Sequence, residues 1–235
     1  MGVWYADRVE GFRSDESAAK GLAVSSLLRV DVARPWMTVR FPGQWRALSF
    51  APYRPGDVAC SEVLWREVRD ADLSECFDAL GWLAGEVSSH QSVAMLTSRN
   101  VERRVIERVE VEGLVAEAVA TVGMSNAERI GRRRARGVGY GTINVVVAVS
   151  EGMTATGRLE ALSLAASART AAVLEAGVQI ESGAATGTGT DCLVVASPPG
   201  ETGFAGMHTA VGEAIGAVVY AAVRRGVDEW LVERD

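Results

Sequence analysis

The order of the strand-like and helix-like runs most constrains how this chain folds. Runs that alternate apolar and polar residues, which are typical of β-strands, follow one another at residues 27–50 and again at 104–122. Helix-like runs rich in alanine come late, at 158–176 and 209–225. Successive strands followed by clustered helices are typical of α+β folds rather than doubly wound parallel sheets. We therefore predict an α+β fold, a layered α/β sandwich in which largely antiparallel sheet is covered by helices.

Turn residues and periodicity divide the chain further. Pro35 and Pro42-Gly43 are expected to split residues 27–50 into three short strands of an antiparallel meander. A helix is predicted at 74–84, and strands at 92–98, 104–112, 115–122 and 141–149. There is no internal repeat and no linker between folded parts. We expect an N-terminal arm at residues 1–25 and a single domain at 26–235.

Composition excludes several classes of partner. The net charge of −6 and the isoelectric point near 5.1 give no bulk attraction to nucleic acid or to an anionic membrane. The three cysteines lack disulfide or zinc spacing, which favours a reducing, cytoplasmic setting. No run approaches the roughly 18 apolar residues of a membrane helix. We expect no nucleic-acid and no membrane partner, and small residues in the last helix are compatible with a monomer or a homo-oligomer.

Several cofactor chemistries are excluded by missing motifs. Lys20 is the only lysine, so a phosphate-binding loop is absent. The glycines of residues 186–191 precede a strand, whereas a dinucleotide fingerprint follows one. The two histidines, His90 and His208, form no zinc motif, and we expect neither a protein-bound metal nor another cofactor. The arginine-rich run 129–136 is interpreted as an exposed loop, with contact to an anionic part of a ligand as the alternative.

The segment 186–191, Thr-Gly-Thr-Gly-Thr-Asp, is the strongest candidate for a functional site. Its glycines let the backbone approach a ligand, and its hydroxyls and carboxylate exceed what a turn needs. Three further polar pairs stand at ends of apolar strands: Thr97 with Ser98, Ser125 with Asn126, and Thr142 with Asn144. Buried polar groups need hydrogen-bond partners, so these clusters are expected to meet one another or a polar ligand. Bonds to neighbouring backbone are the alternative for any single cluster.

His208 and Glu213 form a second group of candidates, close to the start of the last helix. The ordinary pKa range of histidine suits proton transfer at neutral pH, so a catalytic histidine would be His208. A lone histidine in this position is more commonly a helix-start or packing residue. Glu213 is compatible with an ordinary first-turn carboxylate, which the helix dipole favours.

Six motifs occur in the same order as in the adenosylcobinamide amidohydrolases, which this chain resembles. They are Trp45-Arg46-Ala47-Leu48-Ser49-Phe50-Ala51-Pro52, Met95-Leu96-Thr97-Ser98, Gly123-Met124-Ser125-Asn126-Ala127, Gly141-Thr142-Ile143-Asn144, Ala185-Thr186-Gly187-Thr188-Gly189-Thr190-Asp191 and Gly206-Met207-His208-Thr209. The resemblance covers about residues 28–223, and the last two motifs are the most specific. It implies hydrolysis of the amide between the aminopropanol arm and the corrin ring of adenosylcobinamide, which gives adenosylcobyric acid for coenzyme B12 salvage. The partner is then a corrinoid, and cobalt enters only with the substrate.

Amide hydrolysis sets what the site must supply: donors to the carbonyl oxygen, a group that activates water or a hydroxyl, and an acid for the amine. We expect His208 to move protons, Asp191 to orient or activate it, and Asn126, Asn144 or backbone N–H groups of 187–190 to bind the oxyanion. The alternative is a covalent route through Thr188 or Thr190. The residues expected to bind substrate are Thr97, Ser98, Ser125, Asn126, Thr142, Asn144, Thr188, Thr190 and Glu213.

Two other functions compete with this hydrolase. One is a non-catalytic corrinoid-binding protein with the same pocket. The other is an amidohydrolase or peptidase acting on another class of substrate. Preference among cobinamide, its GDP ester and pseudocobalamin does not follow from the sequence.

Overall fold

A mixed sheet of eight strands organises the molecule. The computed structural model describes residues 26–69, 78–87, 89–132 and 140–234. The strands of the sheet are β1 (Arg29–Ala33), β2 (Trp36–Ser49), β3 (Gly56–Glu67), β4 (Ser92–Thr97), β5 (Val105–Val111), β6 (Leu114–Val122), β8 (Ile143–Val149) and β12 (Cys192–Ser197). Their order is β4-β3-β2-β12-β8-β6-β5, and β1 pairs with β2 beside this path. The β3–β4 and β8–β12 pairs are parallel and the other pairs are antiparallel, so the predicted α+β class is confirmed.

The long strand β2 corrects one sequence prediction. Pro42-Gly43 does not end a strand: β2 continues through it, and its register with β3 shifts between Arg40 and Trp45. A bulge bends a strand instead of ending it, and proline is tolerated there because one ladder bond is lost locally. The first part of β2 pairs with β1 and the second part with β12, so the bend carries the sheet from one half to the other. The strand β3 was not predicted.

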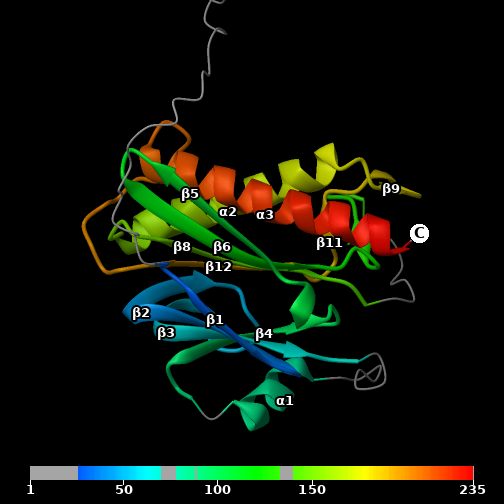
Figure 1. Cartoon of the computed structure of the whole chain (residues 1–235), viewed down its shortest axis with the longest axis horizontal. Helices are drawn as coiled ribbons and strands as arrows, with labels where there is room; N and C mark the ends of the chain where they lie inside the picture. Colours follow the sequence, from blue (N-terminus) through cyan, green and yellow to red (C-terminus); the bar gives the residue numbers. More distant parts are fainter. Residues whose placement is uncertain (1–25, 70–77, 88, 133–139, 235) are drawn as a thin grey trace, which may run out of the picture.

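Two long helices cover one half of the sheet, and a short helix covers the other (Figure 1). The helix α2 (Ala155–Glu175) begins at Thr154, whose hydroxyl accepts a hydrogen bond from Gly157 N. Beside it lies α3 (Ala210–Arg234), which is longer than the predicted 209–225. The short α1 (Ala79–Glu86) overlaps the predicted helix 74–84, of which residues 74–77 lie outside the described part.

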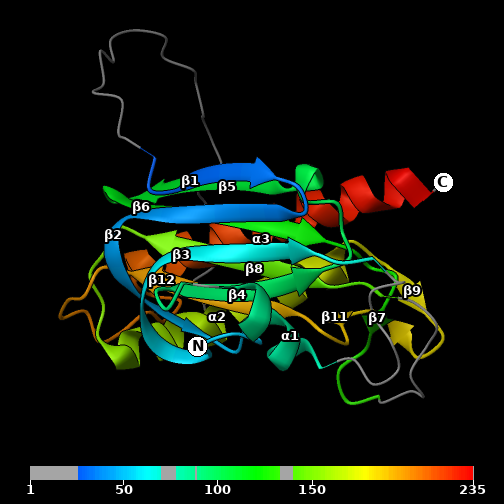
Figure 2. The ribbon, with the colours of Figure 1, turned by 90° about the horizontal axis from the view of Figure 1, so that it is seen from below.

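Alternation along the central strands creates two cores. In β8, Val145 and Val147 belong to the core beneath α2 and α3, whereas Val146 belongs to the core between the two halves of the sheet. Successive strand residues point to opposite faces, which explains this division. The inner core also holds Met37 and Trp65 from the other half. The result is a layered sandwich of helices, sheet, sheet and helix, which Figure 2 shows from the side of α1.

Small elements shape one end of the molecule. They are η2 (Val101–Arg103), β7 (Ala127–Glu128), β9 (Gln179–Ile180), β10 (Gly183–Ala184) and β11 (Gly187–Thr188). β7 pairs with β11, and β9 pairs with β10. Among the described residues, no helix has the length and apolar character that crossing a membrane requires.

Candidate functional site

The four predicted polar clusters meet at one end of the sheet. The parallel strands β8 and β12 pair Asn144 with Cys192, so the segments that precede both strands are neighbours. The pairing of β7 with β11 places Ala127 opposite Thr188, next to these segments. We call the group the polar end; it comprises Thr97, Ser98, Ser125, Asn126, Thr142, Asn144, Thr186, Thr188, Thr190 and Asp191. The clusters are therefore neighbours, as expected, and their binding of a ligand stays a prediction.

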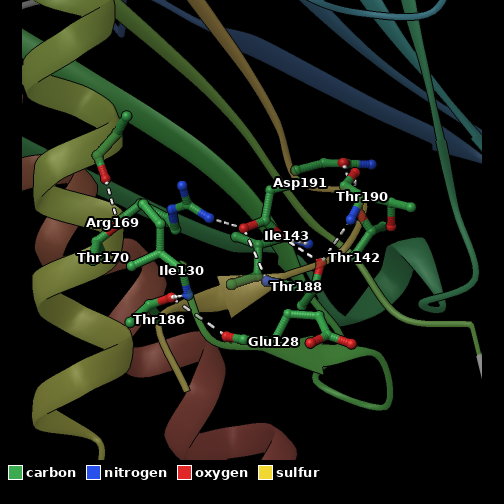
Figure 3. Close-up of polar contacts among 12 residues, drawn as sticks. Glu128, Ile130, Thr142, Ile143, Arg169, Thr170, Thr186, Thr188, Thr190 and Asp191 are labelled. Atoms are coloured by element: carbon green, nitrogen blue, oxygen red, sulfur yellow. Dashed lines mark hydrogen bonds and ion pairs between the residues drawn. The ribbon is translucent and has the colours of Figure 1, made fainter. Parts of the chain in front are cut away.

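Asp191 is the centre of the polar end (Figure 3). Its Oδ1 accepts hydrogen bonds from Ile143 N at 3.0 Å and from the Thr188 hydroxyl at 2.5 Å. Its Oδ2 accepts one from Thr188 N at 3.0 Å. Only 7% of the side chain is exposed. A buried carboxylate is costly unless it is paired and hydrogen-bonded, and these donors meet that requirement.

Arg169 of α2 supplies the opposite charge, in an ion pair with Asp191 Oδ2. Burial lowers the pKa of this guanidinium from its ordinary value. A Cβ at Gly187 would overlap Arg169 Nη1 and Asp191 Oδ2, so a larger residue there would have to displace this pair. Sequence reasoning missed Arg169, because it is one of several polar positions on α2 and no local pattern links it to Asp191.

The hydroxyls of the polar end differ in their hydrogen-bond acceptors. Thr188 donates to the Asp191 carboxylate, whereas Thr190 donates to the carbonyl oxygen of Gly141 at 3.0 Å. The Thr142 hydroxyl donates to the carbonyl oxygen of Thr190 at 2.8 Å. A carboxylate can accept a proton in a reaction and a backbone carbonyl cannot, so Thr188 is distinguished from the other two hydroxyls.

Thr97 and Ser98, at the end of β4, bond to backbone groups. The Thr97 hydroxyl, in a residue that is 1% exposed, accepts a hydrogen bond from Arg99 N at 3.0 Å. The Ser98 hydroxyl donates to the carbonyl oxygen of Tyr140 at 3.0 Å. These contacts favour a structural role for Thr97, while the half-buried Ser98 stays a candidate for substrate binding.

The two asparagines have different surroundings. Asn144 is 1% exposed and its amide nitrogen donates to Leu96 O at 2.6 Å, so it joins β8 to the end of β4. Asn126 is half-buried, and its backbone oxygen accepts from Gly189 N at 3.1 Å. Its carboxamide has no hydrogen bond among the described residues, and neither has the hydroxyl of the exposed Ser125. Asn126 is therefore the side-chain amide available to a ligand.

The loop from β12 to α3, which carries His208, lies at the end of β12 away from β11 (Figure 1), and Glu213 is in the first turn of α3. Asp191 directly precedes this strand, whereas the loop to His208 leaves from its far end. Along α2, Ala205 N contacts Glu160, nine residues before Arg169. Nine residues of α-helix span about 14 Å at 1.5 Å per residue, and this is the distance along α2 between Glu160 and Arg169.

The expected contact between Asp191 and His208 is therefore not made. Both His208 and Glu213 are exposed. Their proposed roles stay predictions, but they do not belong to the polar end.

Other expectations concern cysteine, arginine and metal. Burial raises the pKa of the Cys192 thiol to about 12, which disfavours a thiolate nucleophile. Arg129 donates to Ala184 O at 2.8 Å, and residues 133–139 of the arginine-rich run lie outside the described part. Within the ranges that the structure describes, no three histidine, cysteine or carboxylate side chains form a metal-binding group.

Comparison with known proteins identifies relatives of this chain. A family model described as adenosylcobinamide amidohydrolase matches residues 22–235, which confirms the resemblance seen in the motifs. No curated protein matches. A solved structure of the PH0078 protein from Pyrococcus horikoshii OT3 is similar with a TM-score of 0.43 and 10% identity, over 84% of this chain and 77% of that chain. That likeness is too distant to carry an argument.

Proposed function

Since this chain belongs to the adenosylcobinamide amidohydrolase family, we propose that it cleaves the amide between the aminopropanol arm and the corrin ring of adenosylcobinamide. The products are adenosylcobyric acid and the free amine. One observation carries the placement of this reaction at the polar end: the Thr188 hydroxyl donates a hydrogen bond of 2.5 Å to the Asp191 carboxylate. A hydroxyl paired with a base is the arrangement that nucleophilic catalysis requires.

In the proposed reaction, Thr188 Oγ1 attacks the scissile carbonyl carbon while Asp191 takes the hydroxyl proton. The tetrahedral intermediate carries negative charge on the former carbonyl oxygen, and the Asn126 amide donates a hydrogen bond to it. Collapse breaks the C–N bond, and the proton on Asp191 passes to the leaving amine. Water then hydrolyses the acyl-threonine with Asp191 again as base, which regenerates Thr188 and releases the carboxylic acid.

The geometry favours Thr188 over the two alternatives considered from the sequence. The Thr190 hydroxyl donates to a backbone carbonyl, which cannot take its proton. His208 is in the loop that follows the other end of β12, and the partners of Asp191 among the described residues are Ile143, Thr188 and Arg169. The hydroxyl and amide groups of the polar end also match the amides on the corrin rim.

A covalent intermediate is the specific consequence of this scheme. Rapid acid quenching of the protein with adenosylcobinamide, followed by intact-mass and peptide analysis, should find a cobyric acyl group on the peptide that contains Thr188. Thr190→Val is the matched control, and it should still form the adduct because its hydroxyl takes no part. An adduct elsewhere would contradict the assignment to Thr188. Tight binding of adenosylcobinamide without any cobyric acid product would instead support a corrinoid-binding protein.

A further inference from the structure

A cavity of about 560 Å³ opens beside the polar end. Four segments line it: the loop after β6, the segment around β9, the end of α3, and Arg99 after β4. Ser125 and Ala127 are both in its wall, and they flank Asn126, the proposed donor to the oxyanion. A substrate whose amide carbonyl contacts Asn126 therefore has neighbouring groups within reach of this cavity. Its volume lies in the range of about 300–1,000 Å³ that small-molecule sites occupy.

Part of the cavity wall is apolar and aromatic. Met124 and Val178 are 2% and 8% exposed, and Ile180 and Trp230 lie beside them. The Arg234 guanidinium lies 5.4 Å from the centroid of the Trp230 ring. An indole in a concave wall binds flat heteroaromatic groups well, because stacking adds to the apolar contact.

The charges of the wall compensate one another. Arg99 Nη1 pairs with Glu233 at 2.5 Å, and Arg103 lies 3.4 Å from the same carboxylate. Arg234 and Glu181 add one charge of each sign to the wall. The net charge of the lining side chains Arg99, Arg234, Glu181 and Glu233 is therefore zero. An anionic group such as a phosphate would meet the carboxylates of Glu181 and Glu233, with Arg99 already paired and the Arg234 guanidinium over the Trp230 ring. The cavity therefore suits an uncharged group, with the Ser125 hydroxyl as a hydrogen-bonding partner.

We propose that this cavity binds a neutral purine nucleoside, the adenosyl group that the family's substrate carries on cobalt. The inference rests on the proposed function. Of the parts of adenosylcobinamide, the aminopropanol arm is small and aliphatic, and the rim amides are not aromatic. The corrin ring is much wider than a pocket of this volume. The adenosyl group alone combines a flat heteroaromatic ring with hydrogen-bonding hydroxyls and no charge.

Replacing Trp230 tests this assignment with two substrates, adenosylcobinamide and a cobinamide that carries cyanide in place of the nucleoside. Trp230→Leu should lower kcat/KM for the adenosyl substrate about tenfold or more, which is the scale of one lost stacking contact. It should leave kcat/KM for the cyano substrate within about twofold. Trp230→Phe keeps an aromatic ring and should retain most of the preference. Equal losses with both substrates, or no loss with either, would overturn the inference.

Direct binding separates this inference from the proposed function. Titration with 5′-deoxyadenosine should detect binding to the native protein and to Trp230→Phe, and much weaker binding to Trp230→Leu. Adenosine 5′-monophosphate should bind the native protein more weakly than 5′-deoxyadenosine, because of Glu181 and Glu233. If the native protein cleaves neither cobinamide but binds 5′-deoxyadenosine in this pattern, the hydrolase proposal fails and the nucleoside site stands. Equal nucleoside binding by the native protein and Trp230→Leu would overturn the site whatever the activity.

Discussion

Arg169 fixes the position of the proposed base. It joins the Asp191 carboxylate from α2, while Thr188 and Ile143 hold the same carboxylate from the strand side. With these partners in place, the carboxylate has one orientation toward the Thr188 hydroxyl. Arg169 touches no reacting atom in the proposed scheme, so it is a positioning residue.

Arg169→Ala should lower kcat by about 100-fold, because a shift of about 1 Å between reacting groups has effects of that size. The KM for adenosylcobinamide should change little, since Asn126 and the cavity beside it keep their shapes. Steady-state kinetics measures both quantities. Added guanidinium ion should restore part of kcat in this variant and have no such effect on the native protein. A variant with native kcat would contradict the positioning role.

At the scale of elements, a second polar network joins β2, β3 and α2 at the far end of β12. Asp57 accepts from Arg158 Nη2 at 2.8 Å and from Arg46 Nε at 3.0 Å, and Arg158 is 4% exposed. Burial alone raises the pKa of Asp57, but the hydrogen bonds from Arg158 and Arg46 outweigh it and hold this pKa below its ordinary value. The ionised carboxylate therefore stabilises the fold.

The sign of the pH effect follows from this lowered pKa. The contribution of Asp57 is complete above its unfolded-state pKa, near 4, and is lost as the pH falls through the lower folded-state value. Asp57→Asn should lower the free energy of unfolding at pH 7 by about 2 kcal/mol, because the buried Arg158 loses its counter-charge. The difference from the native protein should shrink below pH 4. Denaturant titrations at pH 7 and pH 3 check this, and an equal difference at both values would contradict it.

Elements with a strong local pattern could be predicted from the sequence. The strand β8, whose residues 145–149 are all apolar, and the helix α2, which is followed by Gly177, lie within a few residues of their predicted positions. The strand β3 was missed because it shows no regular alternation: its residues are half-buried at most positions on both faces. The bend in β2 differs from the predicted turn between two strands, because Pro42-Gly43 is a turn signal unless a neighbouring strand holds the chain extended.

The candidate site was predicted in part, for reasons that belong to the whole molecule. Polar residues at strand ends marked the polar end, because strands side by side bring their ends together. The separation of Asp191 from His208 depends on the direction of β12 and on the length of the loop that follows it, which residue types alone do not reveal. The contribution of Arg169 depends on how α2 crosses the sheet, and this is also a tertiary property.

The whole molecule thus presents two ends, and we propose that the chemistry takes place at one of them. The polar end combines a hydroxyl with a carboxylate, an adjoining cavity and the Asn126 amide, which has no hydrogen bond to another described residue. The opposite end carries His208 and the start of α3. One assay of amide cleavage can test both ends. Loss of the Thr188 hydroxyl would abolish a reaction at the polar end, and loss of the His208 imidazole would abolish a reaction at the opposite end.

The most direct test compares the rates at which Thr188→Val and His208→Ala convert adenosylcobinamide to adenosylcobyric acid. Mass spectrometry measures the product. Both variants should show the native thermal unfolding temperature within a few degrees before rates are compared. Thr188→Val should lose at least about 100-fold in kcat, the scale of a lost nucleophile or general base. His208→Ala should stay within a few-fold of the native rate. Native turnover by Thr188→Val, with loss of turnover in His208→Ala, would contradict the proposed scheme and move the reaction to the other end of β12.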